Sequence, residues 1–203
     1  MILSFRHKGL KDLFETGRSA AIAPELRKRC LQRLALLNRA RNLTALNVSG
    51  LDTHPLHGSN PLRYSMSVNG PWRITFEFSA RDVIGLIWSS IIRQGPVMEY
   101  PVDRAKLARR PPIHPGIIFG DIVMPELRKD RTIAEIAALM GVSRATLHRI
   151  IAGDVAISVD MAVRIAKLCG GEAELWLDLQ TDYDTFRARK RLAKELERIR
   201  TVR

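Results

Sequence analysis

Five polar side chains between positions 143 and 149 have the types and the spacing of a surface that reads nucleic acid. They are Ser143, Arg144, Thr146, His148 and Arg149. An arginine can donate two parallel hydrogen bonds to a guanine edge, and hydroxyl groups can bond to a base or a phosphate. We therefore expect these residues to recognise double-stranded DNA through hydrogen bonds and charge.

The residues around this set predict two helices joined by a tight turn, over residues 132–153. Thr132-Ile-Ala-Glu135 has the form of a capping box at the start of the first helix. Gly141 can take the left-handed conformation that ends this helix, and Ser143 can cap the second. The positions expected between the helices are small or apolar: Ala137, Val142, Leu147 and Ile150. This pattern is typical of a helix-turn-helix, whose second helix enters the major groove. The alternative is that Gly-Val-Ser only joins two ordinary helices.

The charge of the chain agrees with a nucleic-acid partner. The 203 residues carry a formal net charge of +12, and both halves are basic, with +8 over 1–97 and +4 over 98–203. A protein this basic usually binds a polyanion, although a generally basic soluble surface is the simpler explanation. The C-terminal stretch 187–203 holds eight Lys and Arg residues, which predict either a solvated helix face or a contact with the DNA backbone.

Composition excludes several other classes of protein. Cys30 and Cys169 have no CxxC spacing and no histidine cluster beside them, so we expect two buried thiols, no metal site and no cofactor. No stretch reaches about 18 apolar residues, and the first residues are too soon interrupted by charge for a signal peptide. We expect a cytoplasmic protein that does not bind membranes.

The first half is predicted to be a small α+β domain over residues 1–94. Helical patterns cover Lys8–Thr16 and Pro24–Ala40. Two stretches of alternating apolar residues flank Asn69-Gly70, a strong signal for a β-hairpin, and a third apolar run covers Val83–Ile92. Two helices followed by an antiparallel sheet are typical of an α+β domain.

A Pro-rich linker is predicted over 95–115, and an all-α domain over 116–203. We expect the last helix to be broken near Asp182. The predicted helices are Gly116–Lys129, Thr132–Met140, Arg144–Ala152, Ser158–Leu168 and Glu172–Ile199.

The second half resembles a known family. The segments Pro111-Pro-Ile-His-Pro-Gly116, Ile133–Ile151 and Ile157–Leu168, together with Leu175-Trp-Leu-Asp-Leu-Gln180, are similar to the HigA-type antitoxins of the Xre helix-turn-helix group. The resemblance covers about 110–187. It implies a dimer that binds its own operator through Ser143, Arg144, Thr146 and Arg149 and neutralises a toxin.

The first half resembles the HigB-type toxins of the RelE superfamily, through residues 1–11, His54-Pro-Leu-His-Gly58 and 67–76. This resemblance implies cleavage of mRNA on the ribosome, with His54 and Arg73 as candidate catalytic residues. Such cleavage needs a base for the 2′-hydroxyl proton, cations for the phosphate and an acid for the leaving oxygen. His57 is a third candidate, but it stands where the family has a lysine, and Ile91-Ile92 replace an acidic-Tyr-His ending.

These patterns together predict a fused toxin–antitoxin protein that regulates transcription as a homodimer. Because neither Ile91 nor Ile92 can transfer a proton, we expect the toxin half to be inactive or attenuated. One alternative is an active ribosome-dependent endoribonuclease that the attached second half inhibits. Another is an interaction module that binds an intact toxin or antitoxin encoded elsewhere.

Overall fold

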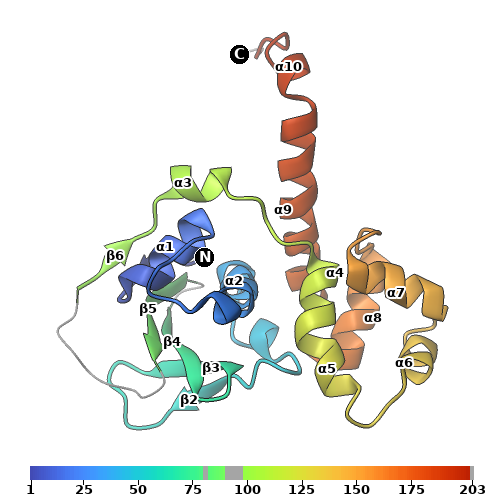
Figure 1. Ribbon diagram of the computed structural model, residues 1–203, viewed down its shortest axis with the longest axis horizontal. Coiled ribbons are helices and arrows are strands. Elements are labelled where there is room, and N and C mark those ends of the chain that lie inside the picture. The colour runs from blue at the N-terminus through green and yellow to red at the C-terminus, as the bar shows by residue number, and fades with distance from the viewer. Residues whose placement is uncertain (80–81, 90–97, 202–203) are drawn as a thin grey trace.

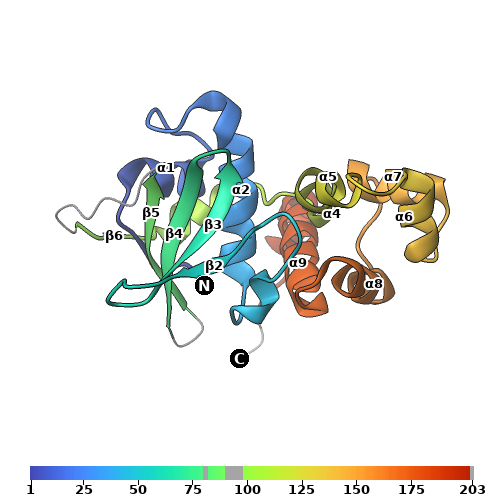
Figure 2. The same ribbon diagram turned by 90° about the horizontal axis from the view of Figure 1, so that it is seen from below.

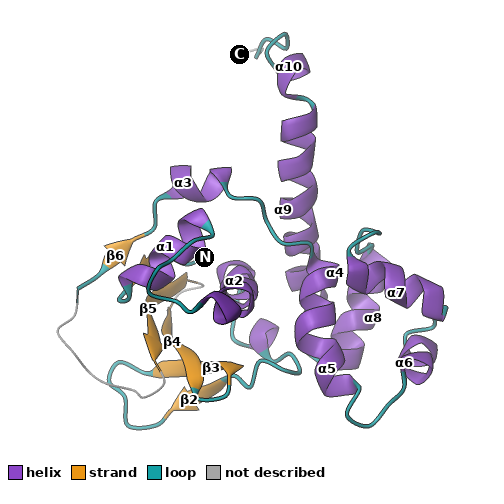
Figure 3. Ribbon diagram, in the orientation of Figure 1, coloured by secondary structure: helices purple, strands orange, loops and turns teal. Residues whose placement is uncertain are grey.

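The computed structural model describes residues 1–79, 82–89 and 98–201. Strands occur only before residue 102, and the rest of the described chain is helical (Figure 3). The structure therefore confirms an α+β region followed by an all-α region. Within the described ranges, no helix is long and apolar enough to cross a membrane.

A six-stranded sheet forms the centre of the first half. Its strands are β1 (Ser4–Phe5), β2 (His54–Leu56), β3 (Arg63–Asn69), β4 (Trp72–Ser79), β5 (Asp82–Ser89) and β6 (Tyr100–Pro101). The order across the sheet is β2-β3-β4-β5-β1-β6, and only the β1–β5 pair is parallel. The predicted hairpin joins β3 to β4 and β5 follows, whereas β1, β2 and β6 are too short to give an alternating pattern in the sequence.

Two helices cover one face of this sheet (Figure 2). They are α1 (Lys8–Thr16) and α2 (Pro24–Arg39), within one residue of the prediction. Leu26, Cys30, Leu34 and Leu37 form an apolar stripe along α2, and all four are buried, as is Cys169. Burial raises the pKa of both thiols to about 12, so neither is a nucleophile near neutral pH.

The segment predicted as a linker contains β6 and a short helix, α3 (Arg104–Arg109). Asp103 caps α3 by accepting hydrogen bonds from the N–H groups of Ala105 and Lys106, at 3.0 and 3.1 Å. Helix α3 packs against α1, so this part of the connection belongs to the first half (Figure 1).

The second half consists of short helices followed by one long helix (Figure 1). They are α4 (Pro115–Ile118), α5 (Met124–Leu127), α6 (Ile133–Leu139), α7 (Arg144–Ala152), α8 (Val159–Cys169), α9 (Ala173–Arg191) and α10 (Ala193–Leu196). The helix predicted over Gly116–Lys129 is present as α4 and α5, joined by a π-helical turn at Phe119–Val123. This turn precedes Pro125, which has no N–H to donate to an α-helical hydrogen bond.

The break expected near Asp182 was a wrong prediction. Helix α9 continues through this position and ends at Arg191, before Leu192. The carboxylate of Asp182 is held by Arg39 of α2 and does not compete for the backbone of its own helix.

His114 explains the Pro-Ile-His-Pro-Gly run at the start of the second half. Its Nδ1 accepts a hydrogen bond from the Gly116 N–H at 3.0 Å, which caps α4. Its ring meets the edge of Tyr183 from α9, with centroids 4.7 Å apart. Burial lowers the pKa of His114, and the neutral ring is the form that can act as this acceptor.

Candidate nucleic-acid interface

The turn between α6 and α7 has the local geometry that the sequence predicts. Thr132 and Glu135 form a complete capping box at the start of α6. Ser143 caps α7, its Oγ accepting from the Thr146 N–H at 3.0 Å. Ala137, Leu147 and Ile150 are buried between the helices, and Val142 is half-buried.

This packing leaves the polar face of α7 accessible. Arg144, His148 and Arg149 are exposed, as is the cap residue Ser143. Thr146 is half-buried, and its hydroxyl lies 2.9 Å from that of Ser143. The five predicted residues are thus brought together at one helix, but Ser143 and Thr146 also hold its first turn, which limits how freely they can contact a ligand.

One residue that the sequence analysis missed fixes this turn. Arg164 of α8 donates hydrogen bonds to the carbonyls of Met140 and Gly141, at 2.5 and 3.2 Å. Gly141 has a φ of +62°, and a Cβ there would lie 2.4 Å from the Arg164 guanidinium. The turn therefore favours glycine for its backbone conformation, and a side chain at this position would displace the Arg164 guanidinium. No local motif marks Arg164, because its partners are carbonyl groups 23 and 24 residues away.

The two halves of the chain meet where α2 packs against the first part of α9 (Figure 1). We call this contact the seam. Arg39 binds both oxygens of Asp182, and Arg41 binds those of Asp178 at 2.9 and 3.1 Å. Toward α5, Asp121 accepts from Gln32 at 2.5 Å and pairs with Lys28 at 2.7 Å. Cations and amides of the first half thus face carboxylates of the second.

Backbone contacts extend the seam beyond these ion pairs. The Ser49 N–H donates to the Cys169 carbonyl at 2.9 Å, and Val48 forms a β-bridge with Gly170. At Gly170 φ is +83°, and a Cβ would lie 2.4 Å from the Asn47 carbonyl oxygen. A residue with a side chain at 170 would separate the two backbones, which gives this glycine a structural role.

Of the candidate catalytic residues in the first half, His54 and Arg73 lie close together. Asp52, which the sequence analysis missed, connects them. Arg73 donates to the Asp52 carboxylate at 3.3 and 3.4 Å, and the His54 Nδ1 lies 3.1 Å from the Asp52 carbonyl oxygen. Both side chains remain accessible, with exposed fractions of 43% for His54 and 34% for Arg73. Asp52 itself has a φ of +48°, an uncommon conformation for aspartate.

The third candidate, His57, is not part of this group. It is exposed in the turn after β2, and within the described part of the chain it forms no hydrogen bond or ion pair. The Ile91-Ile92 pair, on which the expectation of lost activity depends, lies outside the described residues. The described site therefore holds one histidine and one arginine that share an aspartate.

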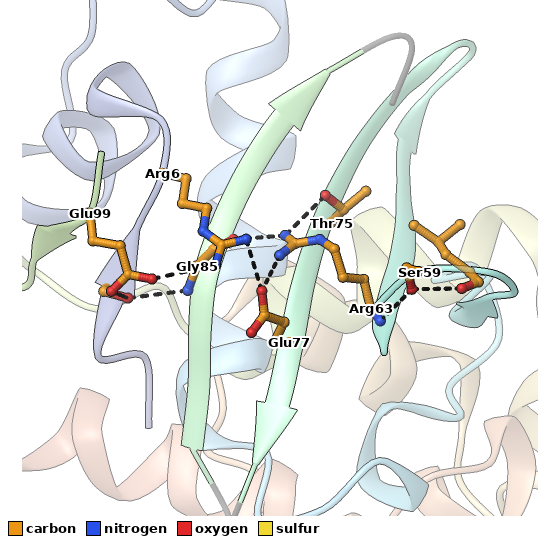
Figure 4. A network of polar contacts seen from close by, with 9 residues as sticks. Arg6, Ser59, Arg63, Thr75, Glu77, Gly85 and Glu99 are labelled. Carbon is orange, nitrogen blue, oxygen red and sulfur yellow. Dashed lines mark hydrogen bonds and ion pairs between the residues drawn. The ribbon is translucent and has the colours of Figure 1, made fainter. Parts of the chain in front are cut away.

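A buried ionic network lies on the same sheet face as Arg73 (Figure 4). Arg63 of β3 donates to the carboxylate of Glu77 on β4 at 2.5 Å and to the Gly85 carbonyl at 2.7 Å. Arg6 pairs with the same Glu77 carboxylate at 2.9 Å. Because Arg73 and Glu77 are four residues apart on β4, their side chains lie on the same face, and the network holds the strand that carries Arg73.

Comparison with known proteins divides the chain in the same way. A family model described as the RelE-like toxin of the type II toxin-antitoxin system HigB matches residues 3–87, and a helix-turn-helix model matches residues 126–176. Endoribonuclease HigB of Proteus vulgaris is 40% identical over 82 residues, which are 40% of this chain and 89% of that protein.

The second half has relatives of its own. The uncharacterized HTH-type transcriptional regulator YbaQ of Escherichia coli K12 is 34% identical over 101 residues, which are 48% of this chain and 86% of that protein. One solved structure that this chain matches is Pseudomonas aeruginosa antitoxin HigA with the higBA promoter. The sequence identity is 32%, the match covers 45% of this chain and 97% of that one, and the TM-score is 0.39. The chain therefore belongs to the HigB-like toxins of type II toxin–antitoxin systems through its first half and carries a helix-turn-helix domain in its second, which makes it a fused toxin–antitoxin protein.

Proposed function

We propose that this chain is a sequence-specific DNA-binding transcriptional regulator of the toxin–antitoxin type, with an attenuated toxin domain attached. It would act as a homodimer in the cytoplasm, so that two copies of α7 reach two half-sites about one helical turn of DNA apart. The observation that carries the proposal is the exposed face of α7, where Arg144, His148 and Arg149 extend from a helix whose start and turn are fixed.

Arg144 is the residue for which we expect the largest loss of sequence-specific binding. Arg144→Ala should weaken binding to DNA from upstream of the chain's own gene by about 1–3 kcal/mol, because the guanidinium can form two hydrogen bonds with a guanine. A gel-shift titration measures this effect. Arg109→Ala is the matched control, since Arg109 is equally exposed but lies on α3, and it should change the affinity little.

The salt dependence of the same titration tests whether DNA is the ligand. The affinity should fall steeply between 50 and 200 mM salt, because phosphate contacts release counterions. If the affinity for upstream DNA changes neither with salt nor with the Arg144 substitution, operator recognition by α7 is contradicted.

The proposal that the toxin half is attenuated rests on two departures from the family's sequence pattern. His57 replaces a lysine, and Ile91-Ile92 replace an ending whose side chains can transfer protons. A second candidate function, cleavage of ribosome-bound mRNA, is favoured by one specific observation. His54 and Arg73 remain accessible and share Asp52, and the second half forms its hydrogen bonds with α2 and with residues 41–49.

Ribosome-dependent cleavage of mRNA by the full chain separates these two functions. We expect little cleavage by the natural chain, and increased cleavage after His57→Lys, Ile91→Tyr and Ile92→His together, because these changes restore a cation and groups that transfer protons. Arg73→Ala in the restored chain is the control and should remove the gain. Strong cleavage by the natural chain that is lost in Arg73→Ala would instead establish an active endoribonuclease.

A further inference from the structure

A groove of about 660 Å³ lies where the seam opens between α1, α3 and the middle of α9. In Figure 1, α3 lies beside α1, and α9 stands across from both. This volume falls within the range of small-molecule sites, and it is too large for a lone phosphate ion. The groove belongs neither to the face of α7 nor to the group around Asp52.

The groove is strongly cationic. Its described lining includes a single acidic residue, Asp182, which is already bound to Arg39. Arg104 donates to the Ile2 carbonyl, and neither Arg189 nor Lys190 has a carboxylate within 4 Å among the described residues. Positive charge gathered in a partly enclosed site attracts an anion more strongly than the same charges spread over the surface.

Arg110 also lines this space, beside the other cations. Its guanidinium lies over the ring of Phe14, 5.6 Å from the centroid, and its Nε is buried with no hydrogen-bond acceptor among the described residues. Burial also lowers the pKa of Arg110.

Beside these cations the groove has an apolar, aromatic wall. Among its lining residues, Phe14 is buried, and Phe186 and Leu107 are half-buried. Aromatic rings next to arginines fit a ligand that has a flat ring as well as negative charge, since bases stack on both kinds of side chain.

We propose that this groove binds a nucleoside phosphate, with the phosphate held by Arg110, Arg189 and Lys190 and the base stacked on Phe186. Two sources share this chemistry, a free nucleotide and one unit of a single-stranded nucleic acid. Because Phe14 and Arg104 lie on the first-half side of the groove and Arg189 and Lys190 lie on α9, the bound molecule would connect the two halves and stabilise the seam.

Isothermal titration calorimetry with the full chain tests the proposal, using AMP, adenosine, inorganic phosphate and a triadenylate RNA as probes. We expect AMP to bind at least about tenfold more tightly than adenosine or phosphate, since each of these lacks one of the two contacts. Triadenylate binding that is tighter than AMP binding would assign the site to a strand, and weaker binding would assign it to a free nucleotide.

Charge reversal at the mouth of the groove supplies the matched comparison. Arg189→Glu with Lys190→Glu should weaken AMP and triadenylate binding about tenfold or more. Arg191→Glu with Lys194→Glu makes the same change of charge on exposed residues that do not line the groove, and should change the affinity less than about twofold.

Phe186→Ala tests the base contact separately, because it should weaken AMP binding while leaving phosphate binding unchanged. The proposal is overturned if AMP and triadenylate bind no more tightly than phosphate, or if both charge-reversed chains lose affinity equally. Neither result would bear on operator binding, which depends on α7.

Discussion

Replacing Glu77 by alanine is expected to lower the free energy of unfolding by about 3–5 kcal/mol. The Glu77 side chain is only 10% exposed and receives both Arg63 and Arg6, at 2.5 and 2.9 Å. Its removal leaves the buried Arg63 beside Arg6 with no carboxylate between them, and each charge keeps the cost of having left water. Urea unfolding followed by the fluorescence of Trp72 and Trp88, which stack on neighbouring strands, measures the loss.

A paired replacement shows whether the loss comes from an uncompensated charge. Arg63→Met combined with Glu77→Leu removes both partners and keeps the site filled, so it should cost much less than Glu77→Ala alone. Arg6 retains Glu99 as a second partner in the paired variant, at 3.6 Å. Equal losses in the two variants would mean that packing, and not charge, dominates at this position.

The sequence predicts the helix-turn-helix closely because its signals are local. The capping box, the turn glycine and the cap at Ser143 each lie within four residues of the group that they satisfy. The α2 stripe and the Asn69-Gly70 hairpin are equally local, and the structure has both. Patterns of this kind can be interpreted from neighbouring residues alone, without knowledge of which distant residues they contact.

Contacts between residues that are distant in the sequence could not be predicted. Arg164 holds the turn from the next helix, and Asp52 joins Arg73 from 21 residues away. The strands β1 and β6 pair with each other across about 95 residues, although each is two residues long. The same limit explains the wrong break in α9, since Asp182 disfavours a helix only until Arg39 of another element binds it.

The seam leaves both candidate sites of the chain uncovered. The carboxylates of Asp121, Asp178 and Asp182 engage α2 and its end, while Arg144 extends from α7 and Arg73 from β4.

The core of the second half gives the other large expected effect. Trp176 is fully buried on α9, and its ring meets Phe119 edge to face, with centroids 6.1 Å apart. Trp176→Ala should lower the free energy of unfolding by about 3–5 kcal/mol, because the cavity cannot fully collapse among packed helices. Circular dichroism during urea unfolding measures this loss, because most of the helical residues lie in the second half.

Trp176→Phe is the matched control for this substitution. It keeps an aromatic ring and removes the indole N–H, which is buried with no hydrogen-bond acceptor among the described residues, so it should cost less than about 1.5 kcal/mol. Trp72 and Trp88 remain in both variants and report on the sheet of the first half. If the seam couples the two halves, their fluorescence transition should move together with the circular dichroism in Trp176→Ala. A sheet transition that stays in place while the helices unfold earlier would show that the halves unfold independently, and that the ion pairs of the seam contribute little to stability.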